Sequence, residues 1–105
     1  MKRFAFKMYL KPGNEAEYER RHAEIWPELK ERISTSGVKN YSIFWDKDTN
    51  ILFSYQEVEG VSNSQDVEAA DEITLRWWNY MADLMKVNND KSPVTIPISE
   101  LWHMD

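Results

Sequence analysis

The amino-acid sequence predicts an α+β fold, in which helices pack on one face of an antiparallel sheet. Three observations predict it. The chain has 105 residues, the usual length of one domain, so residues 1–105 are expected to share a single core. Four short segments have the alternating, aromatic or β-branched composition of strands. Two longer regions repeat their apolar residues every three or four positions, as amphipathic helices do.

The first predicted strand covers Lys2–Leu10, where apolar side chains occupy every second position. These side chains share one face of the strand: Phe4, Phe6, Met8 and Leu10. Pro12 and Gly13 follow directly, and both residues favour a turn. The strand is therefore expected to end before them.

The first helical region runs from Asn14 to Gly37. Asn14 is placed as an N-cap, and Glu17 stands three residues later, as in a capping box. An apolar stripe follows at helical spacing: Tyr18, His22, Ile25/Trp26, Leu29 and Ile33. Pro27 has no backbone N–H to donate, so we expect a kink or a second helix start there. Gly37 is expected to end the helix.

The remaining elements follow from composition. Val38–Asp46 and Ile51–Glu59 are rich in β-branched and aromatic residues, and the polar residues 47–50 between them favour a hairpin. A second helix is predicted over Val67–Met85, and Ile98–Trp102 is predicted as a closing strand. The order β-α-β-β-α-β is that of a ferredoxin-like sandwich.

The predicted middle strands carry large apolar side chains on both faces. Ser42 and Phe44 lie on one face. The opposite face carries Tyr41, Ile43 and Trp45. Two helices cover only one face of such a sheet, so the second face needs another cover. The simplest cover is the same surface of a second copy, which predicts a two-fold homodimer.

Composition and charge exclude several classes of function. The chain has 18 acidic and 13 basic residues and a formal charge of −5, which disfavours a nucleic-acid partner. It contains no cysteine, which excludes a disulfide framework, a thiol nucleophile and a thiolate metal site. No apolar run approaches the ~20 residues of a membrane span, and the N-terminus does not resemble a signal peptide. We therefore expect a cytoplasmic protein without a membrane partner.

Standard catalytic motifs are missing from the sequence. The three glycines are scattered, so there is no glycine-rich phosphate loop, and no G-x-S-x-G motif is present. His22 and His103 are too far apart in the sequence to form a metal motif. We expect neither a bound metal nor a cofactor.

His22 and Tyr18 are the first candidates for a functional site. They are four residues apart on the predicted helix, which places their side chains on one face. An imidazole titrates near neutral pH, and a phenol beside it adds a hydrogen-bond donor and acceptor. The alternative is that His22 only packs at the helix edge, against Tyr18 and Trp26. The neighbouring Arg20 and Arg21 are expected to form a solvated face.

Trp77 and Trp78 are the second candidates. Adjacent helix positions point about 100° apart, so one indole is expected in the core and the other beside a cleft or a subunit interface. Indole faces stack on the C–H faces of sugars, and the indole N–H can bind a hydroxyl. Packing alone is an equally good interpretation of both residues. Tyr41, in the middle of a strand, either presents its hydroxyl to the same cleft or is structural.

Several short segments form a set with a defined order and spacing. They are YERRH at 18–22, IWPEL at 25–29, NY at 40–41, RWWNYM at 76–81 followed by Asp83, and SPV at 92–94. Together they resemble the signature of the L-rhamnose mutarotase family. The resemblance extends from the first predicted strand to the last, which is nearly the whole chain.

The resemblance implies a homodimeric α+β barrel of ferredoxin-like domains that interconverts the α and β anomers of L-rhamnose. It implies His22 as the proton donor. It also implies the residues that contact the sugar: Tyr18, Tyr41, Trp77 and Trp78. This reaction requires neither a metal nor a redox cofactor. The alternative is another dimeric ferredoxin-like protein, either a small-ligand-binding module or an enzyme that degrades haem or oxidises quinols.

Overall fold

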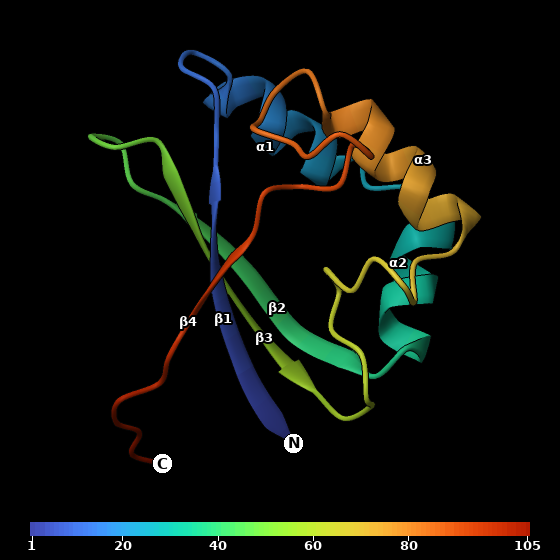
Figure 1. The fold of residues 1–105 in the computed structure, drawn as a ribbon, viewed down its shortest axis with the longest axis vertical. Coiled ribbons are helices and arrows are strands. Elements are labelled where there is room, and N and C mark those ends of the chain that lie inside the picture. The colour runs from blue at the N-terminus through green and yellow to red at the C-terminus, as the bar shows by residue number, and fades with distance from the viewer.

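The structure, a computed structural model, describes all residues from 1 to 105 and contains four strands and three helices. In chain order these elements are β1 (Lys2–Tyr9), α1 (Glu15–Ala23), α2 (Pro27–Thr35), β2 (Val38–Trp45), β3 (Ile51–Val58), α3 (Glu72–Met81) and β4 (Ile96–Ile98). Figure 1 shows the three helices together on one side of a curved sheet.

The sheet is antiparallel throughout, with the strand order β2-β3-β1-β4. Its two central strands, β1 and β3, pair along their whole length, from Lys2↔Val58 to Tyr9↔Ile51. The helices α1 and α2 are the two parts of the first helical region. The arrangement is therefore βαββαβ, and the predicted ferredoxin-like fold is confirmed.

The first helical region breaks at Pro27, as its sequence predicts. Helix α1 ends at Ala23, and Pro27 is the first residue of α2, a position where its missing N–H breaks no helical hydrogen bond. Gly37 then ends the region with a φ of +95°. A Cβ atom on Gly37 would lie 2.9 Å from the backbone nitrogen of Gly60, so this approach requires glycine.

The predicted capping box at the start of α1 is wrong. Asn14 does precede the helix, but its side chain makes no capping hydrogen bond. Glu17 instead forms ion pairs with Arg20 and Arg21. Two guanidinium groups stabilise a carboxylate more strongly than one backbone N–H does, so Glu17 turns along the helix and not back to its start.

The second helix is shorter than the predicted range Val67–Met85. It begins at Glu72 because the Asp71 side chain accepts a hydrogen bond from the Thr74 N–H and caps the helix there. It ends at Met81, after which the chain continues as a turn. The apolar periodicity is present beyond both ends, but the cap sets the start of the helix.

The last strand also differs from its predicted range. Strand β4 covers Ile96–Ile98, not Ile98–Trp102. The apolar residues that suggested the later strand are exposed, Leu101 by 96% and Trp102 by 77%. These side chains are not packed on the core of the chain, so their pattern does not mark a strand.

The core lies between the sheet and the helices. It contains 11 buried residues: Phe6, Met8, Leu10, Tyr18, Leu29, Leu52, Trp77, Trp78, Met81, Leu84 and Met85. The apolar face of β1 therefore points into the core, as the alternation predicts. Three candidate site residues are members of the same cluster, so the site is built into the core.

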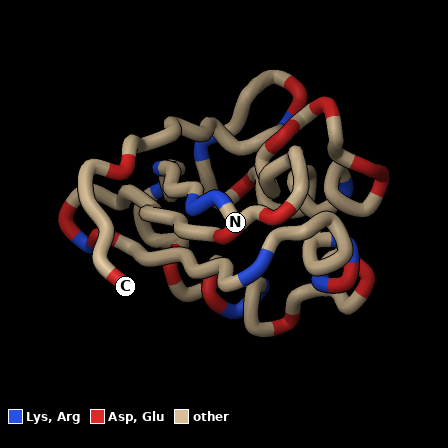
Figure 2. The backbone as a smooth tube through the Cα atoms, turned by 90° about the horizontal axis from the view of Figure 1, so that it is seen from below, with Lys and Arg blue, Asp and Glu red and all other residues tan.

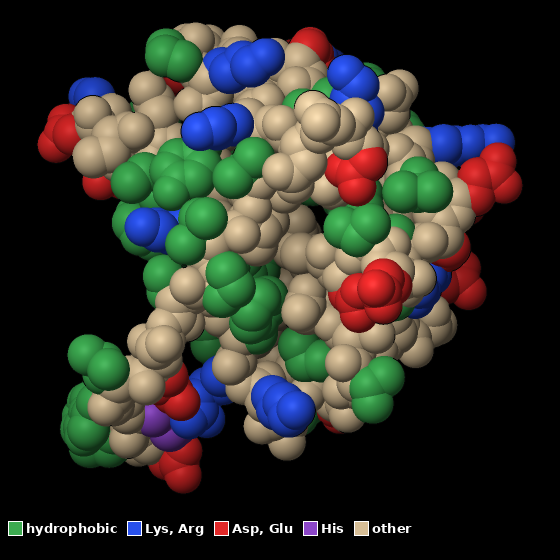
Figure 3. All heavy atoms as spheres, viewed as in Figure 1, with side chains coloured by type: hydrophobic (Ala, Val, Ile, Leu, Met, Phe, Trp, Pro, Cys, Tyr) green, Lys and Arg blue, Asp and Glu red, His purple; other side chains and the backbone are tan.

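The opposite face of the sheet has no cover. Phe44 and Phe53 are cross-strand partners on that face and are 65% and 37% exposed. Ile96 and Ile98 of β4 are also exposed. Figure 3 shows hydrophobic side chains on the sheet side of the molecule and along its C-terminal segment. The prediction that the middle strands carry apolar groups on both faces is confirmed.

Acidic and basic residues are interspersed along the backbone in the view of Figure 2. Many of them pair with each other, as in the helical pair of Arg76 with Glu72. None of the three helices combines the length and the hydrophobicity of a membrane span. The cytoplasmic location stays a prediction.

Candidate functional site

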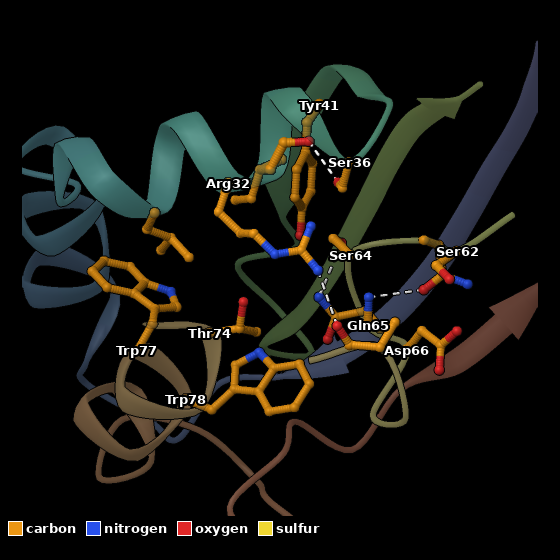
Figure 4. Close-up of a pocket in the computed structure, with 14 residues that line it drawn as sticks. Arg32, Ser36, Tyr41, Ser62, Ser64, Gln65, Asp66, Thr74, Trp77 and Trp78 are labelled. Carbon is orange, nitrogen blue, oxygen red and sulfur yellow. Dashed lines mark hydrogen bonds between the residues drawn. The ribbon is translucent and has the colours of Figure 1, made fainter. Parts of the chain in front are cut away.

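Two adjoining cavities lie between the sheet and the helices. The larger, which we call the cleft, has a volume of about 910 Å³ and lies between α1, α2 and β2. The second, which we call the small cavity, has a volume of about 70 Å³ and lies between α2, α3 and residues 62–66 (Figure 4). Ile33 and Tyr41 line both cavities, which therefore share a wall.

Helix α1 places His22 in the cleft with its imidazole half-buried. The Nδ1 atom lies 3.0 Å from the backbone carbonyl oxygen of Tyr18. A carbonyl only accepts hydrogen bonds, so Nδ1 carries the proton of the neutral ring and Nε2 keeps its lone pair. Burial lowers the pKa of His22 below 6.5, and the hydrogen bond to Tyr18 offsets this only in part. Neutral His22 therefore presents Nε2 as a proton acceptor.

Tyr18 lies directly beside this imidazole. Its ring stacks on that of His22, with centroids 4.4 Å apart and planes 30° from parallel. Burial raises the pKa of the Tyr18 hydroxyl, and the nearby Tyr41 adds to the shift. The hydroxyl therefore stays protonated and can donate a hydrogen bond. The prediction that Tyr18 and His22 share a helix face is confirmed.

A β-bulge turns Tyr41 toward the helices. The register of β2 against β3 shifts between Lys39 and Ser42, and Asn40 has a φ of +49° within this shift. Tyr41 therefore packs against the core and lines both cavities. Burial raises the pKa of its hydroxyl, while polar side chains of residues 62–66 act in the opposite direction.

Trp77 and Trp78 both belong to the core, where they are 8% and 4% exposed. Both also line the small cavity, as Figure 4 shows. The expectation that one indole fills the core while the other borders a cleft is therefore wrong. The small cavity lies beside the buried face of α3. Trp77 and Trp78 on this face therefore belong to the core and also form the cavity wall.

The fold brings together all five residues that the sequence singled out. Tyr18 and His22 line the cleft, Trp77 and Trp78 line the small cavity, and Tyr41 lines both. The two groups meet where the rings of His22 and Trp77 stand at 90°, with centroids 5.4 Å apart. The arrangement offers one titratable imidazole, two phenols and two indole walls in two cavities that share the wall formed by Ile33 and Tyr41.

Arg21 is not on a solvated face, and that expectation is wrong. Its side chain is 11% exposed, whereas that of Arg20 is 52% exposed. The Arg21 guanidinium pairs with Glu17 and Asp83, and its Nη1 donates to the backbone oxygen of Tyr80 at 2.7 Å. Arg21 therefore holds α1 against the end of α3. Its spacing from Glu17 is a helical signal, but nothing local indicates Asp83.

The polar residues of the small cavity have no motif in the sequence. Arg32 of α2, Thr74 of α3, and Ser64 and Gln65 of the connecting loop line it (Figure 4). They come from three separate segments, so only the fold brings them together. The one local signal is the run of small polar residues within 62–66. No three His, Asp or Glu side chains are arranged to hold a metal ion.

Known proteins similar to this chain share its whole length. A family model described as L-rhamnose mutarotase matches residues 3–104. L-rhamnose mutarotases of Bacteroides thetaiotaomicron and Phocaeicola vulgatus are 64% and 63% identical to it over 105 residues, covering 100% of both chains in each case. The crystal structure of an L-rhamnose mutarotase from Formosa agariphila superposes with a TM-score of 0.91 at 46% identity, covering 100% of each chain.

Proposed function

The chain belongs to the L-rhamnose mutarotase family, and we propose that it interconverts the α and β anomers of L-rhamnose through proton transfer by His22. The observation that carries this proposal is the His22 imidazole in the cleft, with Nδ1 bound to the Tyr18 carbonyl and Nε2 left free. The named relatives favour this reaction over the haem- or quinol-type alternative.

Anomer exchange requires the bond between C1 and the ring oxygen to break and re-form. The neutral Nε2 of His22 accepts the proton of the anomeric hydroxyl, and the imidazolium then donates a proton to the ring oxygen as the bond breaks. The open aldehyde rotates about C1–C2, and the reverse transfers close the ring on the other face. Both oxygens are attached to C1, so one imidazole can serve both without a redox partner.

The other four residues bind and orient the sugar. The hydroxyls of Tyr18 and Tyr41 stay protonated because burial raises their pKa values, so each donates a hydrogen bond to a sugar oxygen. The indoles of Trp77 and Trp78 provide apolar walls for a C–H face and for the methyl group of a 6-deoxy sugar. Their fixed position in the core supports an oriented sugar next to His22.

We further propose that the chain forms a homodimer through the uncovered face of its sheet. Phe44 and Phe53 form an exposed apolar pair there, flanked by Ile96 and Ile98 of the edge strand. Pairing with the same face of a second copy removes these side chains from water. The result is the dimeric α+β barrel that the family resemblance implies.

Saturation-transfer NMR with a panel of sugars tests the proposed activity. The α and β signals of L-rhamnose are expected to exchange faster in the presence of the protein than in buffer alone. Other 6-deoxy sugars in the panel measure its selectivity. The absence of acceleration for every sugar would overturn the proposal.

A further inference from the structure

Arg32 extends from α2 into the small cavity and is held there along one edge. Its Nε atom donates to Oδ2 of Asp71 at 2.8 Å, and its Nη2 atom donates to the backbone oxygen of Ala69 at 2.9 Å. Figure 4 shows the guanidinium in the middle of the cavity, between Tyr41 and Trp78. The reaction described above does not use this group.

These two bonds fix the plane of the guanidinium and leave its end free. A guanidinium has five N–H groups in a rigid fork. Asp71 and Ala69 occupy the edge formed by Nε and Nη2. The end edge, formed by Nη1 and Nη2, therefore keeps two parallel N–H groups that are free to donate, one on each nitrogen. The side chain is 32% exposed and lines the cavity, so a ligand can reach this end.

Asp71 also fixes Arg32 relative to the two indoles. Its Oδ1 atom accepts hydrogen bonds from the backbone N–H and the hydroxyl of Thr74, at 3.1 and 2.9 Å, and so caps α3. Trp77 and Trp78 line the same cavity from that helix. One carboxylate thus holds both the donor fork and the start of the helix that carries the apolar walls. Groups held in this way bind a ligand without a large ordering cost.

The size of the small cavity indicates which part of a sugar it takes. At about 70 Å³ it holds a few water-sized groups and not a whole pyranose. Trp77 borders this cavity and also contacts His22. On this basis the anomeric carbon of a pyranose is placed at His22 and hydroxyl groups from its far side in the small cavity, a placement that requires the sugar to pass the wall formed by Ile33 and Tyr41.

Two parallel N–H groups match two neighbouring hydroxyl oxygens. We infer that Arg32 binds a pair of adjacent hydroxyls of the sugar and so selects the hydroxyl pattern that the enzyme accepts. This inference rests on the proposed function and adds a specificity-determining residue to it. The ion pair with Asp71 positions the fork, and the sugar occupies the end that this pair leaves free.

Three variants separate sugar binding from a structural role. Arg32→Met keeps the length of the side chain and removes every donor. Arg32→Lys keeps the charge facing Asp71 but lacks the fork. Arg76→Met is the matched control, because Arg76 is 65% exposed on α3 and pairs only with Glu72 of its own helix. Each is assayed with L-rhamnose and with its 2-deoxy, 3-deoxy and 4-deoxy analogues.

Both Arg32 variants are expected to raise KM for L-rhamnose about 10- to 100-fold, the effect of losing hydrogen bonds to a charged group. Their kcat is expected to stay near that of the control. The wild type should discriminate against at least one deoxy analogue, and Arg32→Met should lose this discrimination. A purely structural role would lower the melting temperature and raise KM for all four sugars equally. That result, or a KM equal to that of the control, would overturn the inference.

A separate measurement distinguishes failure of this inference from failure of the proposed function. If the wild type does not accelerate anomer exchange, the proposed function fails, and the tryptophan fluorescence change on titration with L-rhamnose still measures binding. Weaker binding by Arg32→Met than by Arg76→Met then supports the inference. Equal binding by the two variants, or no binding by the wild type, overturns it.

Discussion

The His22 imidazole and the Trp77 indole stand perpendicular to each other, with ring centroids 5.4 Å apart. His22 comes from α1 and Trp77 from α3, so this contact joins two helices that are distant in the chain. His22 lines the cleft and Trp77 lines the small cavity, so this contact connects the walls of the two cavities. A movement of α1 against α3 therefore changes the position of the proposed proton-transfer group relative to the indole proposed to orient the sugar.

The Arg21→Met substitution is expected to loosen this contact. It removes the ion pair to Asp83 and the hydrogen bond to the Tyr80 backbone, which tie α1 to the end of α3, and also the ion pair to Glu17 within α1. We expect the free energy of unfolding to fall by about 1–3 kcal/mol and anomer exchange to slow. Chemical denaturation and the NMR exchange rate measure the two effects.

Arg20→Met is the matched control on the same helix. The Arg20 side chain is 52% exposed, and its ion pairs are with Glu17 of α1 and with Glu24, the C-cap of the same helix. This variant should keep both its melting temperature and its exchange rate near those of the wild type. Equal behaviour of the two variants would mean that Arg21 does not tie the helices together.

The Trp77→Ala substitution should destabilise the fold as well as weaken sugar binding. The indole is 8% exposed and belongs to the main core, so its removal leaves a cavity that costs about 3–5 kcal/mol. For a domain of this size the loss is a large part of the total stability. A free energy of unfolding close to that of the wild type would show that the indole is not core.

The proposed dimer should dissociate when a charge is placed on the uncovered face of the sheet. Phe44 is 65% exposed, and Phe44→Asp places an unpaired carboxylate from each copy in the proposed two-fold interface. Multi-angle light scattering should show a wild-type dimer, whose obligate interface buries at least ~2,000 Å², and a variant monomer. Leu75→Asp, at a 46% exposed position of α3, should remain dimeric. A monomeric wild type at micromolar concentration would exclude the dimer.

The rate of exchange should depend on pH through His22. Burial lowers its pKa below 6.5, so the proton-accepting neutral form predominates above that value and is lost as the pH falls. We expect kcat/KM to be level above pH 6.5 and to decrease as the pH falls through the lowered pKa of His22. A rate that rises as the pH falls would contradict neutral Nε2 as the first proton acceptor.

His22 also makes the free energy of unfolding depend on pH, and this free energy falls, like the exchange rate, as the pH falls. The unfolded chain protonates His22 more readily than the folded protein does, because only the folded protein buries the ring. The contribution is therefore fully present above pH 6.5 and is lost as the pH falls through the lower, folded-state pKa.

The strands, the break at Pro27 and the pairing of Tyr18 with His22 could be predicted because their signals are local. Alternation marks β1, proline cannot continue a helix, and residues four apart on a helix share a face. The ends of the later elements could not be predicted in the same way. A cap at Asp71 decides where α3 begins, whatever the apolar pattern before it.

The parts of the site that sequence reasoning missed depend on contacts between distant segments. Arg21 of α1 pairs with Asp83, which follows α3 in the chain. Arg32 of α2 pairs with Asp71, the N-cap of α3. Nothing in the sequence of either helix distinguishes these arginines from solvent-exposed ones. Only the packing of the helices gives either of them a partner from a distant segment and a defined direction.

The His22→Asn substitution, assayed by saturation-transfer NMR of L-rhamnose, tests the central claim most directly. Asparagine keeps some of the size and hydrogen bonding of histidine but cannot exchange a proton at neutral pH. We predict that enzyme-catalysed exchange falls by about 100-fold or more, while the melting temperature, the oligomeric state and the Kd for L-rhamnose stay near their wild-type values. An exchange rate equal to that of the wild type would show that His22 only packs against Tyr18 and that another group carries the proton.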